Sequence, residues 1–176
     1  MYWLYVIILL LIAALLQVTV VSAVAVRGVQ PDLILLVAAA IAVRERIGRG
    51  ARWRAFWIGW AAGLIADVYA VGSGLPFGTT ALIWGVFAAV ISRLGDELFV
   101  DSCLAQVLIL APLCVVAQCV LAAAYAGLAG YPFGHVLGRA VWIGLYSGLV
   151  APLVFAALRL VRRPFESHLR RRPRHA

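Results

Sequence analysis

The sequence contains no lysine and only seven acidic residues, and charged residues make up 12% of its 176 positions. An average soluble domain carries about 25% charged residues, which keep its surface in contact with water. A chain with so few charges cannot cover a water-facing surface of that kind. The composition therefore excludes an ordinary soluble domain, and it leaves arginine to supply all 15 basic side chains.

Cysteine is also scarce, and its spacing supports neither a cross-link nor a metal site. Cys103, Cys114 and Cys119 lie in one apolar stretch, without a Cys-x-x-Cys pair and without a histidine near them in sequence. A disulfide framework needs paired cysteines, and a zinc site needs clustered Cys or His ligands. We therefore expect the three cysteines to behave as small buried hydrophobic residues.

The sequence motifs of common enzymes are missing as well. The chain has no Gly-rich phosphate loop, no His-Glu-x-x-His helix and no carboxylate cluster suited to metal-assisted chemistry. Ser73 stands between two glycines but lacks the Gly-x-Ser-x-Gly spacing of a nucleophile elbow. We expect no enzyme activity, no cofactor and no bound metal. An intramembrane hydrolase, the alternative, would need a dyad of Ser73 and His135.

Hydrophobic residues are what the chain has in abundance, at 65% of the sequence with a mean hydropathy of +1.04. A hydrocarbon core about 30 Å thick needs roughly 20 apolar residues per helix. We predict an all-α integral membrane protein of about six transmembrane helices. They form one domain over residues 1–161, followed by an Arg-rich cytoplasmic tail over residues 162–176.

The apolar runs place the six spans at about residues 2–26, 31–45, 54–71, 75–92, 102–128 and 136–158. The first run is too long for the apolar region of a signal peptide. Pro31 and Asp32 open the second span, because proline presets the helical φ and aspartate favours the positive helix end. This span is short and crosses the bilayer only if Arg44 and Arg46 reach the interface.

The arginines predict the orientation of the chain. With six spans and both termini in the cytoplasm, 13 arginines lie on the inner side, and only Arg27 and Arg139 lie on the outer side. This distribution follows the positive-inside rule. A five-span form with the N terminus outside is the alternative if the second helix does not cross. The basic balance indicates contact with anionic lipids and not with nucleic acid.

Two charged residues fall within predicted spans, Asp67 in the third and Arg139 in the sixth. A carboxylate at membrane depth is costly, so it normally faces the helix bundle and has a partner. Both residues lie toward the outer side, which makes a pair between Asp67 and Arg139 a testable hypothesis. A structural anchor of the helix is the simpler interpretation of Asp67. Proton or ion transport would need a longer relay of ionisable groups.

Small and polar residues within the spans predict contacts between helices. Gly59 and Gly63 lie on a face of small residues, where two helices can approach closely, and we expect them to pack within the chain. Gln17, Gln106 and Gln118 are expected to form interhelical hydrogen bonds, although a solute cavity would use the same residue type. The tail is expected to bind anionic lipids of the inner leaflet through Arg162, Arg163, Arg170, Arg171 and Arg172.

Several short motifs occur in a fixed order: Leu16-Gln17, Pro31-Asp32-Leu33, Gly59-x-x-x-Gly63 followed by Asp67, and Gly74-x-Pro-x-Gly78. In this order and spacing the chain resembles the rod shape-determining MreD family. The resemblance implies a role in fold or partner contacts for the matching positions, which are Pro31, Asp32, Gly59, Gly63, Asp67, Gly74 and Gly78.

The resemblance also implies a function. It indicates a non-enzymatic inner-membrane scaffold of the bacterial elongation machinery. Such a scaffold binds the single-span protein MreC and, with it, the peptidoglycan synthase RodA and its class B transpeptidase, linked to MreB filaments. The expected fold resembles the six-helix substrate-binding subunits of energy-coupling-factor transporters. The alternative is therefore a substrate-binding membrane subunit of a small-solute, vitamin-type transporter, which would copurify with a small molecule instead of MreC.

Overall fold

A computed structural model describes residues 2–21, 23, 25, 29–44, 50–70, 74–97 and 103–170 of the chain. The described residues form six α-helices and one π-helical segment: α1 (Tyr2–Leu16), η1 (Gln17–Val21), α2 (Leu33–Arg44), α3 (Ala51–Tyr69), α4 (Thr79–Glu97), α5 (Cys103–Ala129) and α6 (Phe133–Arg170). The prediction of an all-α protein is confirmed.

Glycine and proline mark the helix boundaries. Gly50, Gly78 and Gly130 have φ values of 89°, 95° and 72°, in the left-handed region that glycine enters without a steric cost. Gly50 and Gly78 directly precede α3 and α4, and Gly130 follows α5. Proline cannot continue a helical hydrogen-bond ladder, and Pro132 immediately precedes α6. The turns therefore fall where the sequence supplies residues suited to them.

The helices have the composition of a membrane protein. Within the described residues, three helical segments are long and apolar enough to span a bilayer: Tyr2–Val21, Ile109–Ala129 and Phe133–Leu158. Leu33–Val43 and Thr79–Leu94 are shorter apolar helices. α3 has 19 residues and carries Arg52 and Arg54 in its first turn.

Two helices end later than the spans expected from sequence. α4 continues to Glu97, and α6 continues to Arg170, so that the first part of the expected tail is helical. The backbone of Arg162, Arg163 and Arg170 belongs to α6, but their side chains lie outside the described part of the structure. Arg171 and Arg172 lie outside the described residues altogether, as does the Arg46 expected beside the second span.

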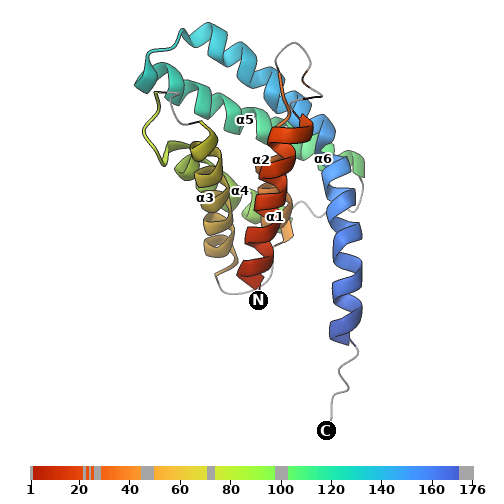
Figure 1. Cartoon of the computed structure of the whole chain (residues 1–176). Coiled ribbons are helices and arrows are strands. Elements are labelled where there is room, and N and C mark those ends of the chain that lie inside the picture. Colours follow the sequence, from red (N-terminus) through yellow and green to blue (C-terminus); the bar gives the residue numbers. More distant parts are fainter. Residues whose placement is uncertain are drawn as a thin grey trace.

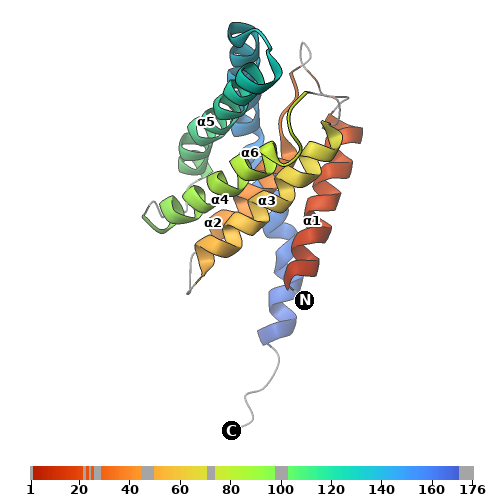
Figure 2. The same cartoon turned by 90° about the vertical axis from the view of Figure 1, so that its left-hand side faces the viewer.

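The helices are arranged as two hairpins around a central helix. α3 packs along α4 and α5 packs along α6, while α2 contacts α1, α3, α4 and α6 (Figures 1 and 2). The residues of α2 from 34 to 40 are all buried. A helix that is apolar on every side is suited to such a position. Protein therefore surrounds most of α2, which at about 1.5 Å per residue is only about 18 Å long.

The start of α1 and the end of α6 point toward the same end of the molecule (Figure 1). The turn between α5 and α6 lies at the opposite end, beyond the upper end of α1. The two ends of the bundle are therefore distinct, one with both outer helix termini and one with the α5–α6 turn.

Candidate functional site

A group of polar side chains meets at the first turn of α2, and we call it the Asp32 cluster (Gln17, Asp32, Gln118 and Ser147). The Asp32 backbone amide donates to Ser147 Oγ of α6 at 2.8 Å. Asp32 Oδ1 accepts from the Leu35 amide at 3.1 Å, and Oδ2 accepts from Gln118 Nε2 of α5 at 3.1 Å. Asp32 is therefore the N-terminal cap of α2 and also joins this helix to α5 and α6.

Gln17 completes the cluster from the other side. Its Nε2 donates to the Pro31 carbonyl at 3.0 Å, and its Oε1 accepts from the Leu33 amide at 2.7 Å. Gln17 is the first residue of the π-helical segment η1, and such segments are wider than an α-helix and are frequent at functional positions. The side-chain amide of Gln17 thus pairs with the backbone on both sides of Asp32.

These bonds satisfy backbone groups that helix geometry leaves without a partner. The first amides of a helix have no acceptor within the helix, and a buried amide without an acceptor costs about 1–3 kcal/mol. In α2, side chains accept from the amides of Asp32, Leu33 and Leu35. These bonds are partly shielded from water, since Ser147 is buried and Gln17 and Asp32 are half-buried. The cluster therefore lets the short helix begin inside the protein.

Asp67 performs a similar task for α4. Its side chain is buried, and Oδ2 accepts from the backbone amides of Gly78 at 2.8 Å and Ala81 at 3.4 Å. These amides belong to the beginning of α4, where the helix dipole favours a negative charge. Asp67 is thus a cap supplied by α3 to the neighbouring helix.

Close packing of α3 on α4 brings Asp67 within reach of these amides. A Cβ atom on Gly59 would overlap the Trp84 carbonyl, and one on Gly63 would overlap the backbone of Ala81. Only glycine fits at either position, so the two helix backbones are in direct contact. The structure thus places the Gly59-x-x-x-Gly63 motif at a contact within the chain.

Asp67 and Arg139 were predicted to form a pair. The contacts of Asp67 lie in α4, whereas Arg139 is exposed on α6 and lines a pocket formed by α5 and α6. The pairing of Asp67 with Arg139 stays a hypothesis, because the hydrogen bonds found for the Asp67 carboxylate run from the amides at the beginning of α4 to Oδ2.

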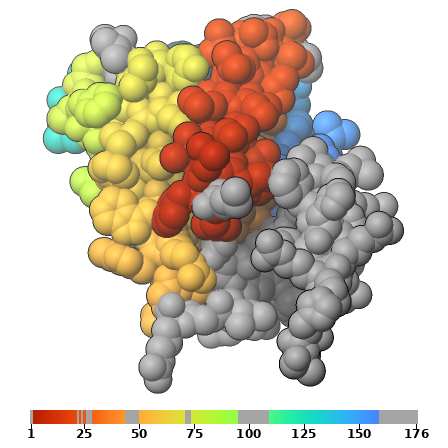
Figure 3. Space-filling view, turned by 60° about the horizontal axis from the view of Figure 1, so that its bottom comes forward, coloured from red at the N-terminus to blue at the C-terminus, as the bar shows by residue number. Residues whose placement is uncertain are grey.

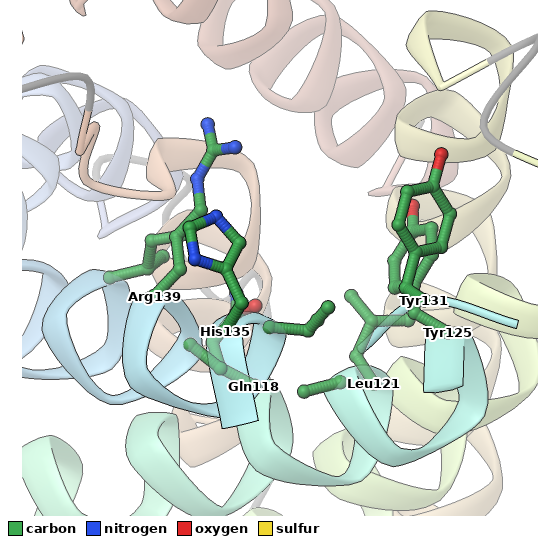
Figure 4. A pocket seen from close by; sticks show the side chains of 10 residues that line it. Gln118, Leu121, Tyr125, Tyr131, His135 and Arg139 are labelled. Carbon is green, nitrogen blue, oxygen red and sulfur yellow. The ribbon is translucent and has the colours of Figure 1, made fainter. Parts of the chain in front are cut away.

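The pocket has a volume of about 510 Å³. Arg139 and His135 stand on one side of it, Tyr125 and Tyr131 stand on the other, and Gln118 lies at its floor (Figure 4). The two tyrosine rings are 6.0 Å apart and nearly perpendicular at 79°. Because Gln118 also donates to Asp32, the pocket and the Asp32 cluster share one side chain.

The other residues singled out from the sequence lie in turns and helices or outside the described part of the structure. Gly74 has a φ of 81° in the turn before α4. Cys114 and Cys119 are free thiols within α5, the first buried and the second half-buried. The Ser73 half of the alternative dyad, and the side chains of Cys103 and Gln106, lie outside the described part of the structure. Among the described residues, no three His, Cys, Asp or Glu side chains gather as metal ligands would.

Sequence reasoning missed Ser147 and the glycines around it. A Cβ on Gly144 would overlap Val115 of α5, and one on Gly148 would overlap Ala111. The signal was present, because Gly144-x-x-x-Gly148 has the same spacing as the motif in α3. Ser147 lies within this motif, directly before Gly148, and is fully buried.

The comparisons with known proteins give one match. A family model described as rod shape-determining protein MreD matches residues 1–161. This range includes α1 to α5 of the described structure and most of α6. No curated protein and no solved structure matches the chain. The short motifs of α2, α3 and α4 are helix caps and helix contacts in the structure. The chain that carries them belongs to the rod shape-determining protein MreD family.

Proposed function

We propose that the chain is a non-enzymatic scaffold of the bacterial cell-elongation machinery, which directs peptidoglycan synthesis in rod-shaped cells. It lies in the inner membrane as a multi-pass protein with both termini in the cytoplasm, and its fold is that of the substrate-binding subunits of energy-coupling-factor transporters. Family membership supports the role in rod shape. The partners are MreC, bound directly, RodA with its class B transpeptidase, and MreB filaments.

The observation that carries the scaffold role is the use of the polar side chains between the helices. Asp32, Asp67 and Gln17 direct their polar atoms at backbone groups of helix termini. A catalytic group must instead face a reacting atom. These side chains fix the positions of helices, which is the property that a binding platform requires.

We propose that MreC packs on the exposed side of α1. Leu4, Ile8, Leu11 and Leu15 are 63%, 47%, 50% and 62% exposed and follow one another at intervals of three or four residues. Such spacing makes one continuous stripe along a helix. α1 runs along the surface of the molecule beside α3 (Figure 3). A single membrane-spanning helix such as that of MreC can pack along a stripe of this kind.

The test is copurification of MreC with the tagged chain in a mild detergent. We expect the triple variant Ile8→Ala, Leu11→Ala, Leu15→Ala to recover several-fold less MreC, since alanine keeps the helix apolar but removes the protruding side chains. The matched control is Leu82→Ala, Val86→Ala, Val90→Ala, which trims the exposed side of α4. If both triple variants recover the same amount of MreC, α1 is not the contact. If the unaltered chain recovers no MreC, the scaffold proposal is wrong.

A solute-binding transporter subunit is the second candidate, and the pocket between α5 and α6 is the observation that favours it. Its volume lies within the roughly 300–1,000 Å³ of small-molecule sites. A transporter subunit should copurify with a stoichiometric water-soluble molecule and with the other transporter subunits, and its loss should leave cell shape unchanged. Rounding of rod-shaped cells after depletion would favour the scaffold.

A further inference from the structure

The pocket of α5 and α6 combines features that no part of the scaffold role uses. Arg139 and His135 lie one helical turn apart on α6 and stand together at one side of the cavity (Figure 4). An arginine guanidinium keeps its charge in any protein environment and binds carboxylate or phosphate oxygens in a forked geometry. The described residues that line the cavity include no acidic side chain. This side of the pocket is therefore suited to an anion.

The other walls are suited to an apolar or amphipathic body. Tyr125 and Tyr131 face the pocket with perpendicular rings, and the remaining lining is largely aliphatic, with Leu121, Val136 and Ile143 half-buried along it. Tyrosine is common where a molecule is apolar at one end and wet at the other. A free inorganic anion would leave these walls without a contact.

The size and position of the pocket narrow the ligand further. About 510 Å³ accommodates a headgroup with the first part of its chains, and a complete two-chain lipid is larger. The pocket lies beside the α5–α6 turn, at the end of the molecule away from the start of α1 (Figure 1). The ends of membrane helices lie near the headgroup layer, where tyrosine is enriched. Phosphate groups of lipids occupy the same layer.

We propose that this pocket binds the phosphate headgroup of an anionic membrane lipid. Arg139 and His135 donate to the phosphate oxygens, and the two tyrosines together with Leu121 contact the glycerol and the first methylene groups. Gln118 lies at the floor and donates to Asp32, so the bound headgroup rests against a residue that joins α5 to α2. The site depends on the pocket alone, and it stands whether or not the chain binds MreC.

The experiment is a native mass spectrometry titration of the full chain in dodecyl maltoside. The probes are dioctanoyl phosphatidylglycerol, dioctanoyl phosphatidylcholine with the same chains, and inorganic phosphate. We expect one phosphatidylglycerol per chain, bound about tenfold more tightly than phosphatidylcholine, because the quaternary ammonium of choline offsets the phosphate charge that Arg139 meets. Binding of inorganic phosphate as tight as that of phosphatidylglycerol would overturn the lipid assignment.

Two variants test the contribution of Arg139. Arg139→Gln should weaken phosphatidylglycerol binding about tenfold, and Arg139→Lys should retain part of it as a point charge. Arg52→Gln is the matched control, since Arg52 is also exposed but lies in the first turn of α3, outside the pocket. Arg139 and Arg52 are both exposed, so the two substitutions each remove one charge from the surface. Equal binding by Arg139→Gln and Arg52→Gln would refute the site.

Discussion

Asp32 and Asp67 each accept hydrogen bonds from backbone amides at the beginning of a helix. In water such a cap contributes about 0.5–2 kcal/mol. In an apolar environment the amides have no water as an alternative acceptor, so the loss of the cap costs more. At the scale of single residues, these backbone bonds explain why two of the seven acidic residues of the chain can lie among its helices.

Substitutions of Asp67 separate the charge from the hydrogen bond. Asp67→Asn keeps an oxygen that can accept from the Gly78 amide, whereas Asp67→Leu leaves that amide without its acceptor. We expect Asp67→Leu to lower the free energy of unfolding by about 1–3 kcal/mol more than Asp67→Asn does. The measurement is the thermal unfolding midpoint in a mild detergent.

Thr79→Ala is the control for this pair. It removes the local bond from Thr79 Oγ1 to the Pro76 carbonyl, which lies in the same turn but is exposed. Its midpoint should fall less than that of Asp67→Leu. A Thr79→Ala protein as unstable as Asp67→Leu would mean that the turn, and not the contact between α3 and α4, is what the aspartate supports.

At the scale of helices, the two hairpins are built in the same way. α3 presents Gly59 and Gly63 to α4, and α6 presents Gly144 and Gly148 to α5. Lipid chains are as apolar as leucine side chains, so burial from water does not drive helices together within a bilayer. Close van der Waals contact does, and small residues permit it. Each hairpin then carries a polar group into place, Asp67 in the first and Ser147 in the second.

Gly63→Ala and Gly148→Ala should each destabilise the protein, because the added methyl group overlaps the neighbouring helix. Overpacking of this kind costs about 1–3 kcal/mol. Gly127→Ala is the matched control, since Gly127 lies within α5 and a Cβ there has no atom within 4 Å. It should be neutral or stabilise the helix by up to about 1 kcal/mol. The thermal midpoint should therefore fall for Gly63→Ala and for Gly148→Ala and should stay the same or rise for Gly127→Ala. A comparable fall for Gly127→Ala would contradict the packing explanation.

At the scale of the whole molecule, the Asp32 cluster joins the first two helices to the second hairpin. Asp32 is 115 positions from Ser147 and 86 positions from Gln118 in the sequence. The central helix α2 is also packed against α3 and α4. One buried helix, α2, thus contacts α1 and both hairpins. Hydrogen bonds with a defined direction form at its first turn, around Asp32.

The proposed orientation is a property of the whole molecule and has a direct test. The start of α1 and the end of α6 lie at the same end of the bundle (Figure 2), which supports both termini on one side of the membrane. Reporters that are active only in the cytoplasm, fused before residue 2 or after residue 176, should both be active. Activity at the C terminus alone would support the five-span form. Activity at neither terminus would reverse the orientation.

Three features of the protein follow from local sequence: its class, its approximate helices and the small-residue contacts of α3. The apolar content of a helix decides whether it partitions into lipid or into water, because each side chain contributes separately to the free energy of transfer. Glycine and proline fix the turns through local sterics, and Gly59-x-x-x-Gly63 indicates a close helix contact through its spacing alone. These are properties of residues near one another in the chain.

The pairing of the polar groups depends on how distant helices pack. Asp67 was predicted to pair with Arg139, whereas the structure shows its Oδ2 accepting from the backbone of α4, which begins beside it. Ser147 gave no signal of its own, and Gln118 was expected in an interhelical bond whose partner could not be named. A hydrogen bond depends on the position of two groups to within a fraction of an ångström. That position is set by how distant helices pack, and the order of residues along one helix does not contain it.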